Sequence, residues 1–373
     1  MDNKIIAESF PPGEFIKDEL EARGWTQSAL ANIMGRQNSV VSALIKGKRA
    51  ISREIAEELG SAFGTSADVW MNLQASYDLY ERGEQKEDVS RRAKLFAMAP
   101  INDMIRRGWI RASDDLDTLE QEVTEFLNEP ISAVSFYKSN PNDEMTPSQR
   151  AWLCQARKIA RGVQAAKFSQ SLFARALQTL KKLLVNPEDV THVARVLAEG
   201  GVRFLIIESL PHTKIDGACF WLDEFSPVIV MTMRYDRIDN FWYVLTHECG
   251  HVKNEHGIDG SDILDINLVG DERVPFKEKP ANEKVADEFA EDFLIDQSAM
   301  NDFVNRKRPA FSKQLIRGFA MKMRVHPGIV LGQLQFREEV GYFHSREMLV
   351  KIRDLVTRTA LTDGWGHTIS MNS

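Results

Sequence analysis

The chain has 373 residues, of which 43% are hydrophobic and 27% are charged, and its formal net charge is −7. This length exceeds one ordinary domain and predicts two or three, each with its own hydrophobic core. No apolar run reaches the roughly 18–20 residues of a membrane-spanning helix, and the first residues lack the layout of a secretory signal. Three widely spaced cysteines argue against a disulfide framework, so we expect a cytoplasmic protein with no membrane partner.

Residues 1–80 are expected to form a compact helical bundle that contains a helix-turn-helix. Helices are predicted at 13–23, at 26–34 with Thr26 as N-cap, and at 38–46, with glycines between them. The second helix of such a pair enters the major groove of DNA by its N-terminus. Five basic residues and no acidic one occur between Arg36 and Arg53, which suits contact with phosphates. The alternative is a small bundle whose polar helix docks a protein.

The candidate DNA-binding residues fall into two groups. The short polar side chains that could reach the edges of DNA bases are Gln37, Asn38, Ser39 and Ser42. The basic side chains that could neutralise phosphates are Arg36, Lys46, Lys48 and Arg49.

Several stretches of this domain carry a resemblance to a known family. They are Pro12-Gly13-Glu14, Gly24-Trp25-Thr26-Gln27, Leu44-Ile45-Lys46-Gly47-Lys48-Arg49, Phe63-Gly64-Thr65-Ser66 and Trp70-Met71-Asn72-Leu73-Gln74. Residues 12–75 thereby resemble the HigA-type branch of the Xre/Cro repressor family. The resemblance implies a homodimer that binds double-stranded operator DNA and often represses its own operon beside a toxin gene.

Residues 81–200 are predicted to form a helical middle region with little chemistry of its own. Helical patterns occur at 90–107, 116–128, 147–165, 168–184 and 187–199. The period then changes, and short β-branched runs at 202–207 and 227–233, with a third strand at 214–222, predict a small sheet. Metalloproteases often hold a substrate as an added strand at a sheet edge, although the sequence leaves open whether such an edge is free here.

An H-E-x-x-H pattern follows the sheet within a predicted amphipathic helix, 239–253. His247 and His251 are four residues apart, so both imidazoles lie on one face of the helix and could bind one Zn²⁺. Glu248 could act as the general base toward a water at the metal. The alternative is a chance meeting of two histidines beside a solvated glutamate.

A catalytic zinc site needs a third protein ligand, and a second helix after Pro280 offers one. Glu283 and Asp287 share a stripe of this helix with small and apolar residues, where an unpartnered carboxylate is costly. Zinc would satisfy Glu283, and the N–H of a ligand imidazole would satisfy Asp287. The alternative is a solvated helix of mixed charge.

A second resemblance rests on the two strands, Arg237, the segment from His247 to His251 and the segment from Glu283 to Ala290. Through these features, residues 201–335 resemble the ImmA/IrrE metallopeptidase family. The resemblance implies zinc ligands at His247, His251 and Glu283, a catalytic Glu248, and a protein substrate, often a DNA-bound repressor. Cys249 and the end of the second helix depart from the family pattern without touching a ligand. A loop role is favoured for His256 over one in substrate binding.

The expected architecture is therefore multidomain. It has an all-α helix-turn-helix domain (1–80), a helical middle (81–200), an α+β zincin-like metallopeptidase domain (201–335) and a helical tail (336–373). Two functions follow: a DNA-binding transcription regulator with a zinc-dependent endopeptidase that cleaves a repressor or itself, or a HigA-like antitoxin and autorepressor. In the second, the zinc domain senses a signal or docks a cognate toxin without proteolysis.

Overall fold

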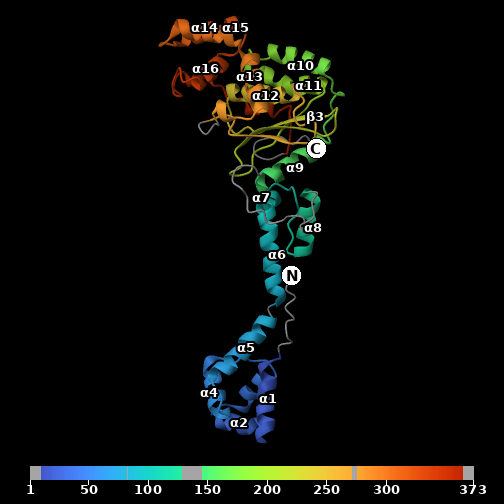
Figure 1. Cartoon of the computed structure of the whole chain (residues 1–373), viewed down its shortest axis with the longest axis vertical. Helices are drawn as coiled ribbons and strands as arrows, with labels where there is room; N and C mark the ends of the chain where they lie inside the picture. Colours follow the sequence, from blue (N-terminus) through green and yellow to red (C-terminus); the bar gives the residue numbers. More distant parts are fainter. Residues whose placement is uncertain (1–9, 82, 128–144, 271–274, 364–373) are drawn as a thin grey trace. The chain divides into compact units, whose positions relative to one another are not determined.

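The computed structural model describes residues 10–81, 83–127, 145–270 and 275–363, and the chain divides into two compact units. The first unit ends at Lys94 and the second begins at Leu95, so the boundary falls within helix α6 (Gly83–Met98). The first unit is all-helical, as predicted. Its other helices are α1 (Pro12–Arg23), α2 (Gln27–Ile33), α3 (Asn38–Ile45), α4 (Arg53–Phe63) and α5 (Ala67–Glu81) (Figure 1).

Local sequence signals set the geometry of the helix-turn-helix. The Thr26 hydroxyl accepts a hydrogen bond from the Ala29 N–H at 3.1 Å, which caps α2. Gly35 after α2 and Gly47 after α3 have φ values of 66° and 65°, a left-handed conformation that glycine adopts without steric cost. At Gly13 of α1, a Cβ atom would lie 2.4 Å from the carbonyl oxygen of Ile45, so only glycine allows α1 to pass this close to α3.

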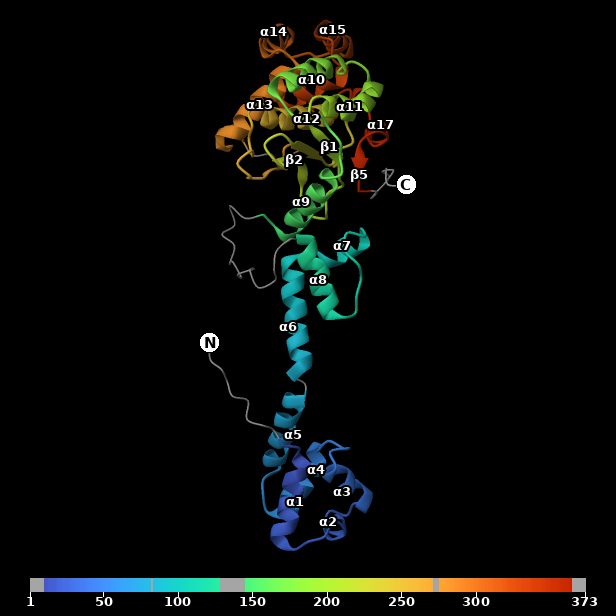
Figure 2. The same ribbon diagram turned by 90° about the vertical axis from the view of Figure 1, so that its right-hand side faces the viewer.

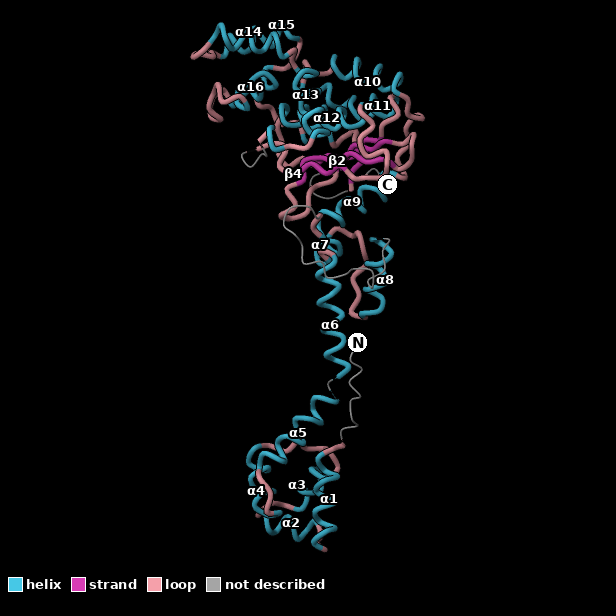
Figure 3. The backbone as a smooth tube through the Cα atoms, viewed as in Figure 1, coloured by secondary structure: helices cyan, strands magenta, loops and turns pink. Residues whose placement is uncertain are grey.

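The second unit is built on a mixed five-stranded sheet in the order β4-β2-β3-β1-β5. Strand β3 runs parallel to β1 and antiparallel to β2, and β4 pairs antiparallel with β2. The strands are β1 (Arg203–Ile206), β2 (Ile215–Trp221), β3 (Pro227–Met231), β4 (Ile263–Ile266) and β5 (Leu361–Thr362) (Figure 3).

Helices cover both faces of this sheet. On one face lie α7 (Ile101–Arg106), α8 (Leu116–Leu127) and α9 (Pro147–Ala160), with the end of α6. On the other lie α10 (Gln170–Lys182), α11 (Val193–Glu199), α12 (Ile238–Lys253), α13 (Ala281–Leu294), α14 (Gln297–Lys307), α15 (Lys313–Met323) and α16 (Pro327–Phe336) (Figure 1). Short turns η2 (Pro187–His192), η3 (Phe276–Glu278), η4 (Arg346–Met348) and α17 (Arg353–Val356) complete the unit.

Alternation along the strands explains why both faces are covered. Phe204 and Ile206 of β1 belong to the core between the sheet and α12, whereas Leu205 between them belongs to the core on the opposite face, between the sheet and α9. On β2, Cys219 belongs to the core on the α12 side and Phe220 to the core on the α9 side. Because successive side chains point to opposite faces, apolar residues at every position require a helical layer on each side.

The predicted mixture of helices and a small sheet is confirmed, but two expectations differ from the structure. The helix expected at 90–107 is interrupted after Met98, because Pro100 has no N–H to continue α6 and instead is the N-cap residue of α7, which begins at Ile101. The region after 336 is not a separate helical tail, since β5 returns to the sheet and pairs in parallel with β1 (Figure 2). Residues 1–9 and 364–373 of the expected terminal regions lie outside the described residues.

The expected boundaries at residues 80, 200 and 335 also differ from the two observed units. Helices α7 to α9, assigned by sequence to a middle region, share one hydrophobic core with strands β1 to β3. Among the described residues, no helix combines the length and the apolar character needed to cross a membrane.

Candidate functional sites

The first candidate site is the surface around helix α3. Gln37, Asn38 and Ser39 at its N-terminus are exposed, and Ser42 is half-buried one turn later. Lys46, Lys48 and Arg49 are exposed just beyond its C-terminus. The opposite face of the helix, including Val41 and Leu44, is buried in the core of the first unit. The polar and basic residues proposed for DNA contact are therefore available on one side of the helix.

Arg36 is placed differently from the other candidates. Its guanidinium donates to both carboxylate oxygens of Glu58, at distances from 2.7 to 3.1 Å, and also reaches Glu54 at 2.5 Å. These two carboxylates raise the pKa of Arg36 above its ordinary value. Two acidic partners on α4 already occupy this guanidinium, so its clearest structural role is to fix the turn before α3 against α4.

The second candidate site lies in the second unit, where α12 presents both histidines toward α13 and β4. The Nε2 atoms of His247 and His251 are 3.0 Å apart, and both side chains are fully buried. Glu283 of α13 places one oxygen 3.2 Å from Nε2 of His247 and the other 3.6 Å from Nε2 of His251. The three residues that the sequence singled out as ligands thus meet at one point.

A fourth side chain enters the same cluster. Oδ2 of Asp265, on the edge strand β4, is 3.5 Å from Nε2 of His247 and 3.9 Å from Nε2 of His251. One ligand atom from each of the four residues lies within 4.8 Å of every other. Sequence reasoning did not select Asp265, because its strand is short and sits in a generally acidic stretch. Its alternation with apolar Leu264 and Ile266 was the available signal.

The donor set fits a zinc ion. Ligand bonds of roughly 2.0–2.1 Å in a tetrahedron put neighbouring donor atoms about 3.3–3.4 Å apart. The histidine nitrogens lie 3.0 Å from each other and 3.2–3.9 Å from the carboxylate oxygens of Glu283 and Asp265, and one donor atom from each residue lies within 4.8 Å of every other. Oδ2 of Asp265 is buried and makes no hydrogen bond among the described residues, the nearest ring nitrogen being Nε2 of His247 at 3.5 Å. A buried, unsatisfied carboxylate oxygen is costly, and a cation would satisfy it. Two carboxylates also balance the charge of a divalent ion.

Partners behind the histidines orient their rings. Oδ1 of Asp287 is 3.0 Å from Nδ1 of His247, on the side of the ring away from the cluster, although the geometry of this contact is not that of a hydrogen bond. The same carboxylate accepts hydrogen bonds from the Tyr243 hydroxyl at 2.9 Å and the Lys279 ammonium at 2.6 Å. His256 lies in the turn after α12, and its Nδ1 is 2.9 Å from Nδ1 of His251.

Glu248 is fully buried beneath strand β2, and both its carboxylate oxygens lack a hydrogen-bond partner among the described residues. Gly217 of β2 makes the room for it, because a Cβ atom there would lie 2.1 Å from Oε1 of Glu248. Gly250 has a related role on α12, where a Cβ would lie 3.0 Å from Cα of Ala286 on α13. Two glycines thus set the distances from α12 to the sheet and to α13.

The pKa values of Glu248, His247 and Glu283 are shifted both by burial and by neighbouring charges. Burial raises the pKa of Glu248 well above its usual range, and the neighbouring Asp265 carboxylate raises it further. Burial alone would lower the pKa of His247, but Asp265, Asp287 and Glu283 outweigh it and raise that pKa. Burial opposes the charge of Glu283 as well, yet its contacts with the two histidines lower its pKa. Without a cation, the cluster therefore favours a protonated His247.

Comparisons with known proteins bear on the first unit. Residues 16–70 match the family model described as helix-turn-helix. The chain is 34% identical over 84 residues to the uncharacterized HTH-type transcriptional regulator YddM of Escherichia coli strain K12, which covers 22% of this chain and 88% of that protein. It is 34% identical over 83 residues to antitoxin HigA-1 of Vibrio cholerae, covering 22% of this chain and 78% of the antitoxin.

A solved structure of the Pseudomonas aeruginosa antitoxin HigA with the higBA promoter is 34% identical, with 21% of this chain and 92% of that chain covered and a TM-score of 0.20. The sequence matches and the helix-turn-helix geometry of α2 and α3 agree. Through its first unit, this chain belongs to the helix-turn-helix family of transcription regulators, with HigA-type antitoxins among its relatives.

Proposed function

We propose that this protein is a DNA-binding transcription regulator whose second unit is a zinc-dependent endopeptidase. The observation that carries the enzymatic part is the convergence of His247, His251 and Glu283 beside a buried Glu248. We assign double-stranded operator DNA as the partner of the first unit and a protein, such as a repressor or a second copy of this chain, as the substrate. The first unit would act as a homodimer, as in the family it resembles.

The exposed face of α3 supports the DNA-binding part. Gln37, Asn38 and Ser39 would contact base edges, while Lys48 and Arg49 would contact phosphates. Selection from a random pool of DNA duplexes would identify the preferred site. Alanine at Lys48 and Arg49 should weaken binding to every sequence and reduce the salt slope by about 0.9 per lost phosphate contact. Alanine at Gln37 and Asn38 should relax sequence preference, and unchanged preference would contradict the assignment.

In the enzymatic part, His247, His251 and Glu283 would hold the metal. A bound zinc supplies a Lewis acid that polarises a carbonyl and lowers the pKa of water. Glu248 would accept the proton of the attacking water and return it to the departing amine. Its pKa, which burial raises, suits the first of these transfers, because a carboxylate with a raised pKa is a stronger base.

Glu248→Gln tests the enzyme directly. It should leave the zinc content at one ion per chain and abolish cleavage of the protein's own chain or of co-purified partners. Glu288→Gln, exposed on α13, is the matched control. Cleavage that survives in Glu248→Gln would overturn the proposed role of Glu248.

Asp265 favours a second candidate function. Catalytic zinc sites have three protein ligands and an open position, whereas structural sites have four protein ligands. With Asp265 in the cluster, the second unit could hold its metal as a sensor or a toxin-docking module of an antitoxin-like autorepressor. In that case Glu248→Gln should change neither repression nor toxin neutralisation, and wild-type protein should show no cleavage.

A further inference from the structure

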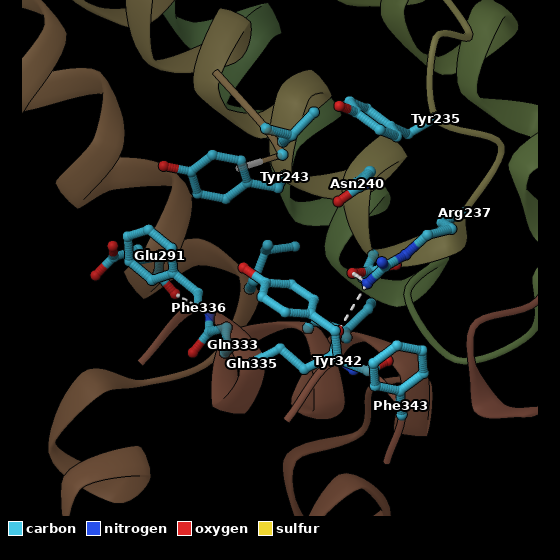
Figure 4. Close-up of a pocket in the computed structure, with 16 residues that line it drawn as sticks. Tyr235, Arg237, Asn240, Tyr243, Glu291, Gln333, Gln335, Phe336, Tyr342 and Phe343 are labelled. Carbon is cyan, nitrogen blue, oxygen red and sulfur yellow. Dashed lines mark hydrogen bonds and ion pairs between the residues drawn. The ribbon is translucent and has the colours of Figure 1, made fainter. Parts of the chain in front are cut away.

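A separate cavity of about 400 Å³ lies in the second unit, beyond the cluster of histidines and carboxylates. Its walls come from the first turns of α12 with Tyr235 before it, Val269 and Gly270 after β4, the last turns of α13, helix α16 and the segment after α16. Figure 4 shows Glu291 at one end, Arg237 at the other, and the rings of Tyr243 and Tyr342 between them. This volume is in the range of small-molecule sites, which are roughly 300–1,000 Å³.

The charge at the Arg237 end is already balanced within the protein. Its guanidinium donates two hydrogen bonds to Asp239, at 3.1 and 2.6 Å, and a third to Gln335 at 3.0 Å. An anionic ligand would therefore meet a cation whose nearest neighbour is a carboxylate. That end offers little net attraction for a negative charge.

The carboxylate of Glu291 has no such balance. Among the described residues no hydrogen bond or ion pair reaches it, although the residue is only partly exposed. The nearby cations direct their hydrogen bonds to other groups, since Lys279 donates to Asp287 at 2.6 Å and Arg337 donates to the neutral amides of Asn301, at 2.7 Å, and Gln297, at 2.5 Å. Burial raises the pKa of Glu291, and the positive charges of Arg337 and Lys279 offset this only in part.

The rest of the cavity is aromatic, and part of it faces solvent. Phe336 is 43% exposed, Tyr342 45% and Phe343 87%, and all three line the cavity. Large exposed aromatic side chains grouped at a cavity mark ligand-binding surfaces. Aromatic rings also attract organic cations by their negatively charged faces. The walls and the carboxylate thus select the same kind of ligand.

We propose that this cavity binds a small organic amine, with its ammonium group on Glu291 and its apolar body against Tyr243, Phe336 and Tyr342. The site is distinct from the metal cluster, although it shares Tyr243, whose hydroxyl donates to Asp287 behind His247. The inference does not depend on proteolysis, because its test measures binding alone.

The test uses three probes of similar shape and different charge on the full-length protein: phenethylamine, phenethyl alcohol and hydrocinnamate. Binding is measured by ligand-observed NMR and calorimetry. Phenethylamine should bind at least roughly tenfold more tightly than the neutral alcohol, as expected for one added hydrogen bond to a charged group. Hydrocinnamate should bind most weakly.

Glu291→Gln should lower the affinity for phenethylamine to that for the alcohol, whereas Glu288→Gln on the exposed face of the same helix should leave it unchanged. Thermal unfolding of each variant checks that the second unit is folded, and the three-probe comparison on wild type holds whether or not Glu291→Gln folds. Equal binding of amine and alcohol, no binding of the amine, or preference for hydrocinnamate would overturn the proposal.

Discussion

Oδ2 of Asp265 lies 3.5 Å from Nε2 of His247, although the two residues come from an edge strand and from the helix beneath the sheet. This distance places an acidic side chain where a three-ligand zinc site would hold water or substrate. In the proposed metal site, Asp265 on strand β4 therefore distinguishes a site with an open position from a closed one. Asp265 is accordingly the residue whose substitution separates the two candidate functions most sharply.

Asp265→Asn should weaken zinc binding by more than the roughly 10–100-fold typical of a residue that only supports a ligand. It should also change the visible absorption spectrum of the cobalt-substituted protein, because a ligand would be lost from the ion. Asp259→Asn, in the exposed turn before β4, is the control. An unaltered cobalt spectrum in Asp265→Asn would remove Asp265 from the ligand set. A gain of proteolysis would indicate that Asp265 holds the enzyme inactive.

Asp287→Asn should reduce zinc affinity by about 10–100-fold while leaving the cobalt spectrum close to that of the wild type. The reason is that Asp287 touches Nδ1 of His247, on the side away from the cluster. Affinity is measured by competition with a chelator, with Glu288→Gln as the control on the same helix. Equal affinity in the variant and the wild type would show that Asp287 does not support the ligand.

Gly217→Ala should destabilise the second unit by about 1–3 kcal/mol, the range for overpacking a core. The added methyl group cannot coexist with Oε1 of Glu248, which it would approach to 2.1 Å. The double variant Gly217→Ala with Glu248→Ala should recover much of this loss, because the carboxylate is then gone. The coupling is measured by denaturant unfolding of the wild type, Gly217→Ala, Glu248→Ala and the double variant. Gly318→Ala, where a Cβ meets nothing within 4 Å, is the control. If the effects of Gly217→Ala and Glu248→Ala on the free energy of unfolding were additive, the close approach of these two residues would be contradicted.

Asp216 should make the second unit less stable as pH rises. Burial raises its pKa to about 6 from 3.8, despite the Val269 N–H at 3.2 Å and Arg234 at 3.6 Å. Because the folded state binds the proton more tightly, stability falls between pH 4 and pH 6 and stays lower above it. A shift of about two units corresponds to about 3 kcal/mol.

Asp216→Asn should therefore gain stability relative to the wild type as pH rises from 4 to 7, as measured by denaturant unfolding at each pH. Glu224→Gln, an exposed substitution near the end of β2, is the control. A difference between Asp216→Asn and wild type that does not vary with pH would show that the folded environment leaves this carboxyl unshifted.

Local pattern was sufficient for much of this protein. Several features depend only on neighbours within one or two helical turns. They are the cap at Thr26, the left-handed glycines after α2 and α3, and the four-residue spacing of His247 and His251. Such features fix element type, the helix-turn-helix and the shared face of the histidines. The stripe on α13 likewise gave Glu283 and Asp287, because burial of a carboxylate requires a partner.

Tertiary structure alone decided the rest. Asp265 joins the cluster only because β4 pairs with β2 above α12, and Glu248 is enclosed because Gly217 lets that helix approach the sheet. Arg36 meets Glu58 across 22 positions of sequence. Strand β5 reaches β1 across more than 150 residues. These contacts join segments distant in sequence, and their geometry depends on the packing of the whole unit, which no local periodicity encodes.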